Sequence, residues 1–528
     1  MLVYSIELGI PKFGLNFPYH VFCELVKPDP IKAPTPTKKF FILFYTKRLF
    51  SFIIISMNKL ANLKNKKITV MGLGLNRGGL GVTRFLAEAG AEVLVTDLKT
   101  EKELQKSLDE LKQYNNINYV LGGHRIEDFI SREMIIQNPG VPHHSKYLQI
   151  ARENGIPIET DLSLFLRICP SRNLIAVGGT KGKSTVTDLI YHIFCHAGKD
   201  IVHAGNIGIS VFDVLPEIKA DTLVLLEISS WQLEGIQQIN CKPKVAVLTN
   251  ILPDHLDRYD SFNDYVCSEK LICRNLDKLD YLVTNFDNPI TKNLGHETSA
   301  EILWFSTKKE VPRGSYLKGG KLFFRFTPKR VEFGNINDIP IPGEHNISNV
   351  LAAANVAYIM NLPLDKINKG IQTFTGVPDR LEKIRTLNHI NFYNDTCATT
   401  PEATIAAIQS FPDKRIILIL GGKDKKLKYS HLCQAIKNSD NIDQLVVLRH
   451  PEYNASEMIV KELLELGLEN KIQTCSSLTD SVRIAYQKAV PGTNILLSPS
   501  ATSFGMFQNE FDRGTSFRQA VKELPDII

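Results

Sequence analysis

The sequence predicts three successive α/β domains, each with a largely parallel β-sheet covered by helices. A short apolar strand followed by glycines and then by a helical pattern occurs twice, starting near residue 67 and near residue 173. After about residue 377, strand-like runs at 415–422, 444–450 and 493–505 alternate with helical stretches. A chain of 528 residues also exceeds what one hydrophobic core can organise.

Composition narrows the class of protein. The chain is 43% hydrophobic and 22% charged, which is typical of globular proteins. Its net charge is +6, and the first 56 residues, with seven Lys/Arg and three Asp/Glu, contribute +4 of it. The remainder is nearly neutral, which argues against nucleic-acid binding. Nine scattered cysteines without a CxxC pair argue against a disulfide framework or zinc site and favour a reducing cytoplasm.

The first 56 residues form a leader that we expect to lie outside the fold. The apolar run 40–56 is interrupted by Lys47 and Arg48, and Met57 begins a stretch that reads like the natural start of a domain. An upstream extension is therefore favoured over a membrane anchor, which remains the alternative. The domains are expected at 57–170, 171–376 and 377–528.

The first domain has features of a diphosphate-binding unit. A strand at 67–71 runs into Gly72 and Gly74, and a second strand ends at Asp97. The turn at Asn138, Pro139 and Gly140 follows another strand, which should reach the same sheet edge. The glycines permit close approach to a diphosphate, but these residues leave open whether it belongs to NAD or to another nucleotide.

The second domain contains an incomplete P-loop. The pattern of glycine, four residues and then Gly-Lys-Ser would place its first glycine at Val177. Lys183 is still expected to reach terminal phosphates, and the Ser184 hydroxyl to bind Mg²⁺. Glu227 ends an apolar strand, where a carboxylate is costly to bury unless Mg²⁺ or another cation pairs with it.

Other loop positions supply further candidates. His255, in the loop after the strand that ends near Asn250, could contact a metal or phosphate, whereas Lys270 reads by composition as a solvated lysine. Asn346 stands near the start of an Ala-rich helix. In the third domain, ligands should bind at strand ends, at 421–425 and 498–507.

Seven motifs together resemble the Mur ligase family over residues 57–528. They are GTKGKST (179–185), GNIG (205–208), LEISSWQLE (226–234), NILPDHLDRY (250–259), EHNISNVLAA (344–353), GVPDRLE (376–382) and SATSFGMFQNEFDRG (500–514). The resemblance implies a Rossmann-like N-terminal domain, a central P-loop ATPase domain and a Rossmann-like C-terminal domain. It also implies a shortened P-loop that lacks the first glycine.

The resemblance implies an ATP-dependent amide ligase of peptidoglycan precursor synthesis. ATP would phosphorylate the carboxylate of UDP-N-acetylmuramoyl-L-alanine, and the amine of glutamate would displace the phosphate. Two Mg²⁺ ions are implied, held by Ser184, Glu227, His255 and a carbamylated Lys270. The implied catalytic residues are Lys183, Glu227, His255 and Lys270. A monomer acting in the cytoplasm, without a membrane or nucleic-acid partner, is expected.

The remaining site residues follow from the same resemblance. The implied ATP-binding residues are Gly178, Gly179, Thr180, Lys181, Gly182, Lys183, Ser184, Thr185, Asn346, Arg380 and Asp395. The implied UDP-sugar-binding residues are Gly72, Gly74, Asn76, Gly78, Gly81, Asp97, Asn138, Gly140 and Asn206.

The amino-acid site departs from the family pattern. Cys397 stands where many relatives have a lysine that helps to hold glutamate, which leaves Lys425, Ser503 and Phe504 as the glutamate-binding candidates. Lys423 is a weaker alternative. D-glutamate is favoured and L-glutamate stays open. A folylpolyglutamate synthase would lack the first domain, and an NAD-dependent dehydrogenase would leave Lys183 without a role.

Overall fold

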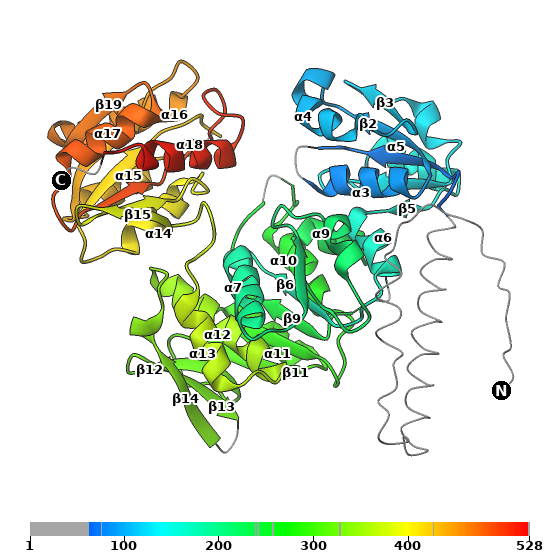
Figure 1. The fold of residues 1–528 in the computed structure, drawn as a ribbon, viewed down its shortest axis with the longest axis horizontal. Helices are drawn as coiled ribbons and strands as arrows, with labels where there is room; N and C mark the ends of the chain where they lie inside the picture. The colour runs from blue at the N-terminus through cyan, green and yellow to red at the C-terminus, as the bar shows by residue number, and fades with distance from the viewer. Residues whose placement is uncertain are drawn as a thin grey trace, which may run out of the picture. The chain divides into compact units, whose positions relative to one another are not determined.

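The computed structural model describes residues 63–74, 77–237, 239, 242–255, 258–326, 329–425 and 427–525. The predicted leader, 1–56, and Asn76 lie outside these residues. The described residues belong to one unit, 59–528. Figure 1 follows it through three sheets, coloured from blue through green to red. The predicted α/β class is confirmed, whereas the three domain boundaries stay predictions.

The first sheet has the strand order β3-β2-β1-β4-β5, with neighbouring strands parallel. Because β1 is flanked by β2 and β4, the chain changes direction across the sheet beside β1, where open α/β sheets bind ligands. Its strands are β1 (Lys67–Met71), β2 (Glu92–Asp97), β3 (Ile117–Leu121), β4 (Met134–Gln137) and β5 (Ile158–Glu159). Its helices are α3 (Arg77–Glu88), α4 (Glu101–Leu111), α5 (Lys146–Glu153) and α6 (Asp161–Ile168).

The central sheet has the order β14-β13-β12-β11-β10-β9-β6-β8-β7. It is parallel from β7 to β12, and β12, β13 and β14 are antiparallel, a feature that the sequence analysis did not anticipate. Its strands are β6 (Leu174–Gly178), β7 (Ile201–Gly205), β8 (Leu223–Glu227), β9 (Val245–Leu248), β10 (Tyr281–Asn285), β11 (Glu301–Ser306), β12 (Gly314–Lys318), β13 (Lys321–Phe326) and β14 (Lys329–Asn335). Its helices are α7 (Lys183–His196), α8 (Val211–Val214), α9 (Ser230–Gly235), α10 (Phe262–Lys270), α11 (Pro289–Glu297), α12 (Glu344–Ile359) and α13 (Leu364–Thr373).

The third sheet has the order β15-β16-β20-β17-β18-β19, with only the β15–β16 pair antiparallel among the pairings described. The change of direction lies between β17 and β20, so the loops after these two strands meet at one edge. Its strands are β15 (Glu382–Leu387), β16 (Ile390–Asn394), β17 (Ile416–Leu420), β18 (Ile442–Leu448), β19 (Ile472–Cys475) and β20 (Asn494–Leu497). Its helices are α14 (Pro401–Gln409), α15 (Ser430–Lys437), α16 (Asn454–Glu465), α17 (Leu478–Lys488) and α18 (Glu510–Lys522).

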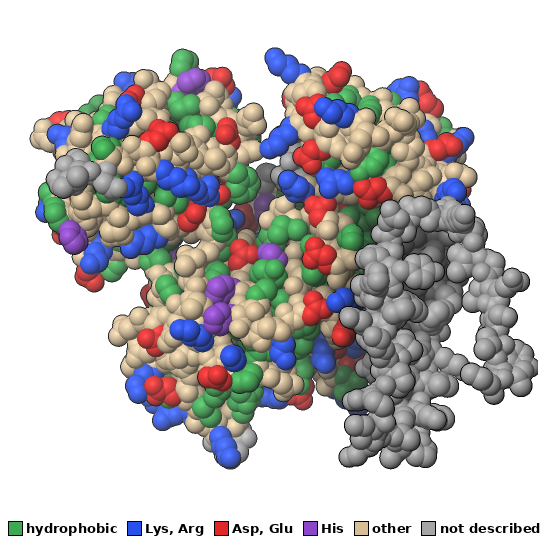
Figure 2. All heavy atoms as spheres, in the orientation of Figure 1, with side chains coloured by type: hydrophobic (Ala, Val, Ile, Leu, Met, Phe, Trp, Pro, Cys, Tyr) green, Lys and Arg blue, Asp and Glu red, His purple; other side chains and the backbone are tan. Residues whose placement is uncertain are grey.

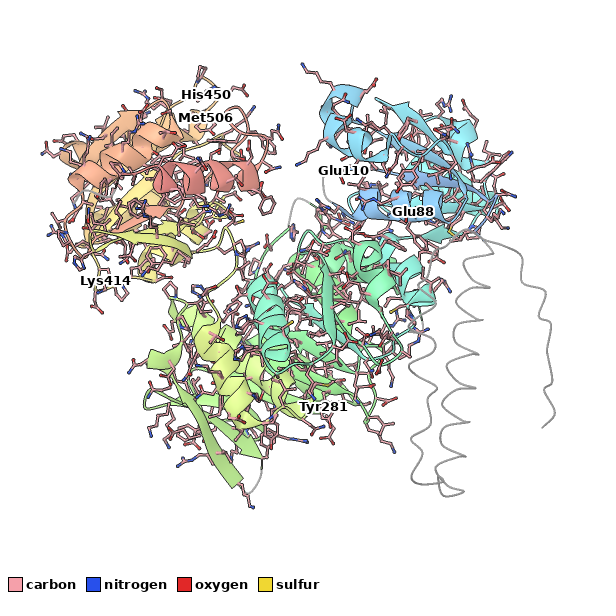
Figure 3. All side chains as sticks on the ribbon, viewed as in Figure 1. Glu88, Glu110, Tyr281, Lys414, His450 and Met506 are labelled. Atoms are coloured by element: carbon pink, nitrogen blue, oxygen red, sulfur yellow. The ribbon has the colours of Figure 1, made fainter. Side chains whose placement is uncertain are left out.

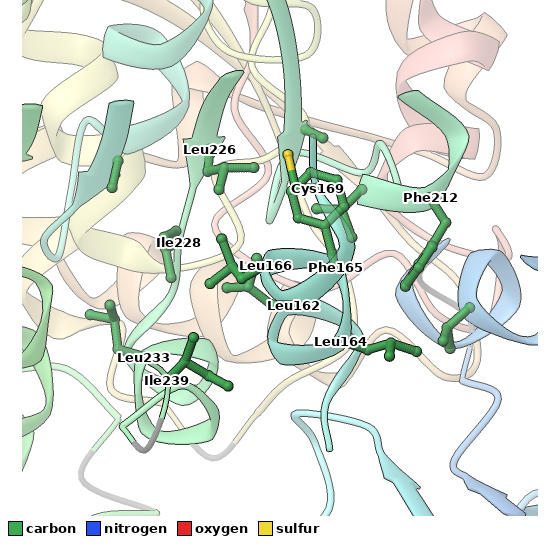
Figure 4. Close-up of a cluster of buried hydrophobic side chains, with 14 of the residues drawn as sticks. Leu162, Leu164, Phe165, Leu166, Cys169, Phe212, Leu226, Ile228, Leu233 and Ile239 are labelled. Atoms are coloured by element: carbon green, nitrogen blue, oxygen red, sulfur yellow. The ribbon is translucent and has the colours of Figure 1, made fainter. Parts of the chain in front are cut away.

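Helix α6 connects the core of the first domain to that of the central domain. Its Leu162 and Phe165 are buried in one cluster with Phe212 of α8 and Leu226 of β8 (Figure 4). The rings of Phe165 and Phe212 meet edge to face, with centroids 6.3 Å apart. Apolar burial of this kind contributes about 25 cal/mol per Å², so α6 holds the two sheets together.

The surface mixes charges of both signs. On the face shown in Figure 2, basic and acidic side chains are interspersed, in keeping with the small net charge of +6. Figure 3 labels Glu88 and Glu110 in the first domain. Glu88 accepts a hydrogen bond from the Tyr114 hydroxyl, and Glu110 pairs with Arg84. Within the part of the chain that the structure describes, no helix has the length and apolar character needed to span a bilayer.

Candidate active site

The phosphate loop, residues 178–184, joins β6 to the N-terminus of α7. Val177, where the usual first glycine would stand, lies inside β6 and is fully buried, so it precedes the loop. Gly179 and Gly182 have φ of 110° and 88°, a region that glycine adopts without strain. A Cβ on Gly182 would lie 2.5 Å from Asn349 Oδ1. The loop is thus a close-packed glycine turn that opens a helix, as phosphate binding requires.

Lys183 is held against this loop. Its Nζ donates to the carbonyl oxygens of Gly179, at 2.6 Å, and Thr180, at 3.0 Å. Burial lowers its pKa, while the nearby carboxylates of Glu269 and Glu227 act to raise it. The ammonium is therefore positioned at the loop before any phosphate binds.

Glu227 ends β8 beside Lys183 and is 1% exposed. Its Oε1 accepts a hydrogen bond from Asn206 Nδ2 at 2.8 Å, and its buried Oε2 has no hydrogen-bond partner among the described residues. Burial raises its pKa, whereas Asn206, Lys183 and Ser184 favour the charged form. A buried oxygen without a partner beside Ser184 suits a cation such as Mg²⁺.

The loop after β9 packs against the phosphate loop. Asn250 Oδ1 accepts from the Lys181 amide, and Asn250 Nδ2 donates to the Lys181 carbonyl oxygen, both at 3.0 Å. Lys181 Nζ also pairs with Asp254 at 2.9 Å. His255 follows with φ of 53°, and its ring centroid lies 5.3 Å from that of Trp231. Left-handed backbone at a non-glycine residue is uncommon and concentrates at functional sites.

Lys270 does not lie with this group, contrary to the expectation from the resemblance. Its Nζ pairs with Glu297 at 3.1 Å, and it lines a separate surface pocket with Arg274. The preceding residue, Glu269, reaches the phosphate loop instead, and its Oε2 accepts a hydrogen bond from the Gly179 amide at 3.0 Å. Successive helical residues point about 100° apart, so α10 directs only one of the two toward the loop.

The start of α12 also borders the phosphate loop. Asn349 Nδ2 donates to Asn346 Oδ1 at 3.0 Å, and both side chains are buried. Because Asn349 closely faces Gly182, this asparagine pair lies beside the loop. The contact of Asn346 with nucleotide stays a prediction.

Arg380 belongs to a strained connection into the third domain. Its neighbours Asp379 and Leu381 have φ of 66° and 44°. Asp395, at the end of β16, accepts hydrogen bonds from the Leu381 amide, at 3.1 Å, and the Ser498 hydroxyl, at 2.8 Å. Burial raises the pKa of Asp395 to about 7. Asp395 thus fixes the backbone beside Arg380, and its predicted ribose contact is untested.

The predicted first-domain residues divide into two groups. Asn138 donates to the Gly72 carbonyl oxygen at 3.1 Å, so the two turns meet at one edge of the sheet as expected. Asp97 accepts from the Gly74 amide at 3.0 Å and thereby shapes the glycine turn. Gly81 faces the central domain, because a Cβ there would lie 2.0 Å from Ser210 Oγ. Its small size serves packing between α3 and α8, which spacing alone could not distinguish from ligand binding.

The third-domain candidates lie on two linked loops. Lys423 and Thr502 exchange backbone hydrogen bonds, at 2.9 and 3.1 Å, which join the loops after β17 and β20. Lys425 is exposed, and its Nζ lies 3.4 Å from Thr399 Oγ1. Ser503 is buried with no hydrogen-bond partner for its hydroxyl among the described residues, whereas Phe504 is 49% exposed. Lys423 itself pairs with Glu452 at 2.8 Å.

A cavity of about 690 Å³ collects residues from all three domains. Asn138 and Gly140 line it from the first domain, Ser184 and Asn206 from the central domain, and Arg380 from the third. It is also lined by residues that the sequence analysis did not select, namely Arg77, Asp161, Asp188, His203, Trp231, Glu510 and Phe511. Asp188 could have been noticed, because it stands one helical turn after Ser184 and thus shares its face.

The comparisons with known proteins cover all three domains. Family models match at 66–160, described as "Mur ligase MurD-like, N-terminal domain", at 177–357, described as "Mur ligase middle domain", and at 379–501, described as "Mur ligase, glutamate ligase domain". UDP-N-acetylmuramoylalanine–D-glutamate ligase of Roseiflexus sp. (strain RS-1) is 38% identical over 87% of this chain and 99% of the relative. The enzyme with the same name from Acetivibrio thermocellus is 36% identical over 88% of this chain and 97% of the relative.

Solved structures share the fold. UDP-N-acetylmuramate–alanine ligase from Thermotoga maritima has a TM-score of 0.58 at 20% identity, over 87% of this chain and 99% of that one. A pseudomurein peptide ligase type C from Methanothermus fervidus has a TM-score of 0.52 at 19% identity, over 87% of this chain and 100% of that one. Fold and site together define a three-domain enzyme with a phosphate loop. The sequence relatives go further, and the chain belongs to the Mur ligase family.

Proposed function

We propose that this protein joins D-glutamate to UDP-N-acetylmuramoyl-L-alanine with conversion of ATP to ADP and phosphate, in peptidoglycan precursor synthesis. The observation that carries the proposal is the shared cavity, which brings the phosphate loop together with residues of the first and third domains. Mur ligases are ATP-dependent and generally Mg²⁺-dependent. The curated relatives are D-glutamate ligases by name and match over nearly their whole length.

The reaction needs an activated carboxylate. An oxygen of the alanyl carboxylate attacks the γ-phosphorus of ATP, which gives an acyl phosphate and ADP. The glutamate amine then attacks the acyl carbon, the C–O bond to phosphate breaks, and the amine loses a proton. Such phosphoryl transfer depends on positioning and charge stabilisation rather than on covalent help from the protein.

The central domain supplies that stabilisation. Lys183 already donates its hydrogen bonds toward the loop, so ATP phosphates can replace the carbonyl oxygens of Gly179 and Thr180 as acceptors. Ser184 and the free oxygen of Glu227 fit Mg²⁺, which when bound neutralises phosphate charge. Arg380 lines the same cavity and can oppose negative charge on the transferred group.

The nucleotide sugar and the amino acid are assigned to the outer domains. Asn138, Gly140 and Asn206 line the cavity where the UDP-sugar would approach. Lys425 supplies a cation and Ser503 an unpartnered buried hydroxyl for glutamate. Cys397 lines the cavity as a neutral group, because burial raises its thiol pKa to about 11.

The test is phosphate release with purified full-length protein. Release from ATP should require both UDP-N-acetylmuramoyl-L-alanine and D-glutamate, and mass spectrometry should show the amide product. L-glutamate and a neutral amino acid serve as comparison substrates. Preferred use of L-glutamate would reassign the stereochemistry, and equal use of the neutral amino acid would remove carboxylate recognition. The monomeric state and cytoplasmic location stay predictions.

A further inference from the structure

Two buried carboxylates flank Lys183 from different elements. Glu227 comes from the end of β8 and Glu269 from the last turn of α10, and each is 1% exposed. Glu227 pairs with Val177 across β8 and β6, directly before the phosphate loop. Glu269 accepts a hydrogen bond from the Gly179 amide, and Lys183 Nζ donates to the carbonyl oxygen of the same glycine. Glu227 and its unpartnered oxygen already account for one cation position. The resemblance to the Mur ligase family did not imply a role for Glu269.

Glu269 is fixed by contacts to the phosphate loop and to its own helix. Its Oε2 accepts from the Gly179 amide at 3.0 Å, and its Oε1 accepts from the Tyr265 hydroxyl at 2.9 Å. Tyr265 Oη in turn lies 2.8 Å from Thr180 Oγ1. Each carboxylate oxygen keeps a further lone pair after these contacts. The carboxylate is therefore held rigidly at the loop and can still bind a cation.

The described residues do not form a metal site from protein side chains alone. Among them, no group of three or more His, Cys, Asp and Glu side chains could hold a metal ion. Mg²⁺ is commonly bound by one or two carboxylates together with the phosphates of a nucleotide. Two separate carboxylates at one phosphate loop fit this mode, with one protein carboxylate for each ion.

We propose that Glu269 is a built-in carboxylate ligand for the second Mg²⁺ and replaces the carbamylated lysine implied by the family resemblance. This inference rests on the proposed function. Lys270, the lysine next to it, pairs with Glu297 and lines a different pocket, so it needs no carbamate. The enzyme should accordingly bind its metals without CO₂.

The experiment counts metal ions on the full-length protein. Mn²⁺ binding is measured by electron paramagnetic resonance with UDP-N-acetylmuramoyl-L-alanine and the β,γ-imido analogue of ATP, in buffer freed of CO₂. Wild type should bind two Mn²⁺ ions, and Glu269→Gln should bind one, with at least tenfold weaker affinity at the lost position. Lys270→Ala is the matched control and should bind two.

Glu269→Gln should fold, because its amide oxygen can accept from Gly179 and its amide nitrogen can donate to Tyr265. Glu269→Lys is a second variant, in which a lysine at this position can be converted to a carbamate and so restore a carboxylate ligand. It should bind one Mn²⁺ without CO₂ and regain the second when ¹³C-bicarbonate is added, with a carbamate signal by ¹³C NMR. The same label should give no carbamate signal in wild type.

The experiment distinguishes failure of the Glu269 inference from failure of the proposed function. Two Mn²⁺ ions in Glu269→Gln would show that Glu269 only supports the loop, and a carbamate signal or CO₂-dependent binding in wild type would restore a lysine ligand. Either result overturns this inference while wild-type ligase turnover preserves the proposed function. A wild type with neither nucleotide-dependent Mn²⁺ binding nor turnover overturns both.

Discussion

The phosphate loop of the central domain and the two ligand loops of the third domain differ in how firmly their side chains are held. Lys183 is fixed by two carbonyl oxygens and flanked by two buried carboxylates. Lys425 is exposed and lies 3.4 Å from a single hydroxyl. Charge stabilisation of a transition state needs groups that are fixed in advance. Recognition of an amino acid can instead be completed when the ligand binds.

This contrast implies that substitutions in the two regions should act on different kinetic constants. Changes at the phosphate loop should lower kcat, because they remove stabilisation made in the transition state. Changes on the third-domain loops should mainly raise the KM for glutamate, because they remove ground-state binding.

The largest effect is expected for Lys183→Ala. It removes the cation that opposes charge developing on the transferred phosphoryl group, and kcat should fall by about 10²-fold or more. Steady-state phosphate release measures the loss, and circular dichroism with thermal melting checks that the fold is intact. A folded variant with near-normal kcat would falsify the assignment of the phosphate loop.

A smaller effect of another kind is expected for Lys425→Ala. The KM for glutamate should rise by about tenfold or more, since a charge-assisted contact to a carboxylate contributes roughly 1.5–3 kcal/mol. The KM values for ATP and the UDP-sugar should change little. Lys423→Ala is the matched control, because Lys423 pairs with Glu452 and should be dispensable for glutamate. If Lys423→Ala gave the larger rise, the two lysines would exchange roles.

Asp395 provides a pH-dependent test of how the connection into the third domain is held. Burial raises its pKa to about 7, whereas an unfolded aspartate titrates near 3.9. Between about pH 4 and 7 the unfolded chain releases a proton that the native state retains, so this group makes stability fall as pH rises. At pH 8 the melting temperature of Asp395→Asn should be a few degrees above that of wild type. Near pH 4 the two melting temperatures should be equal. If the difference in melting temperature between Asp395→Asn and wild type were the same at both pH values, the raised pKa of Asp395 would be contradicted.

The smallest effect is expected for Cys397→Ser. Because burial raises its thiol pKa to about 11, Cys397 should be uncharged at neutral pH and add no electrostatic recognition. The kcat and the glutamate KM of the variant should stay within about twofold of wild type from pH 7 to 9. A marked change in the glutamate KM that grows with pH would indicate that the thiolate takes part.

The sequence by itself determined the features set by short-range spacing. The strand at 67–71, the glycine turn into α7 and Glu227 at the end of β8 follow from local periodicity and appear as predicted. Parallel strands bring their carboxyl ends to one edge, so the meeting of Gly72 with the turn at Asn138 also followed from chain order.

Only the tertiary structure decided which member of a local pair faces the site. Glu269 and Lys270 are adjacent in sequence, and their separation of about 100° around α10 becomes meaningful only once the packing of that helix is known. Gly81 likewise reads as a ligand-binding glycine until Ser210, 129 residues later in the chain, is found 2.0 Å from where its Cβ would lie. Spacing limits the directions in which a side chain can point, and contacts between distant segments determine what it meets there.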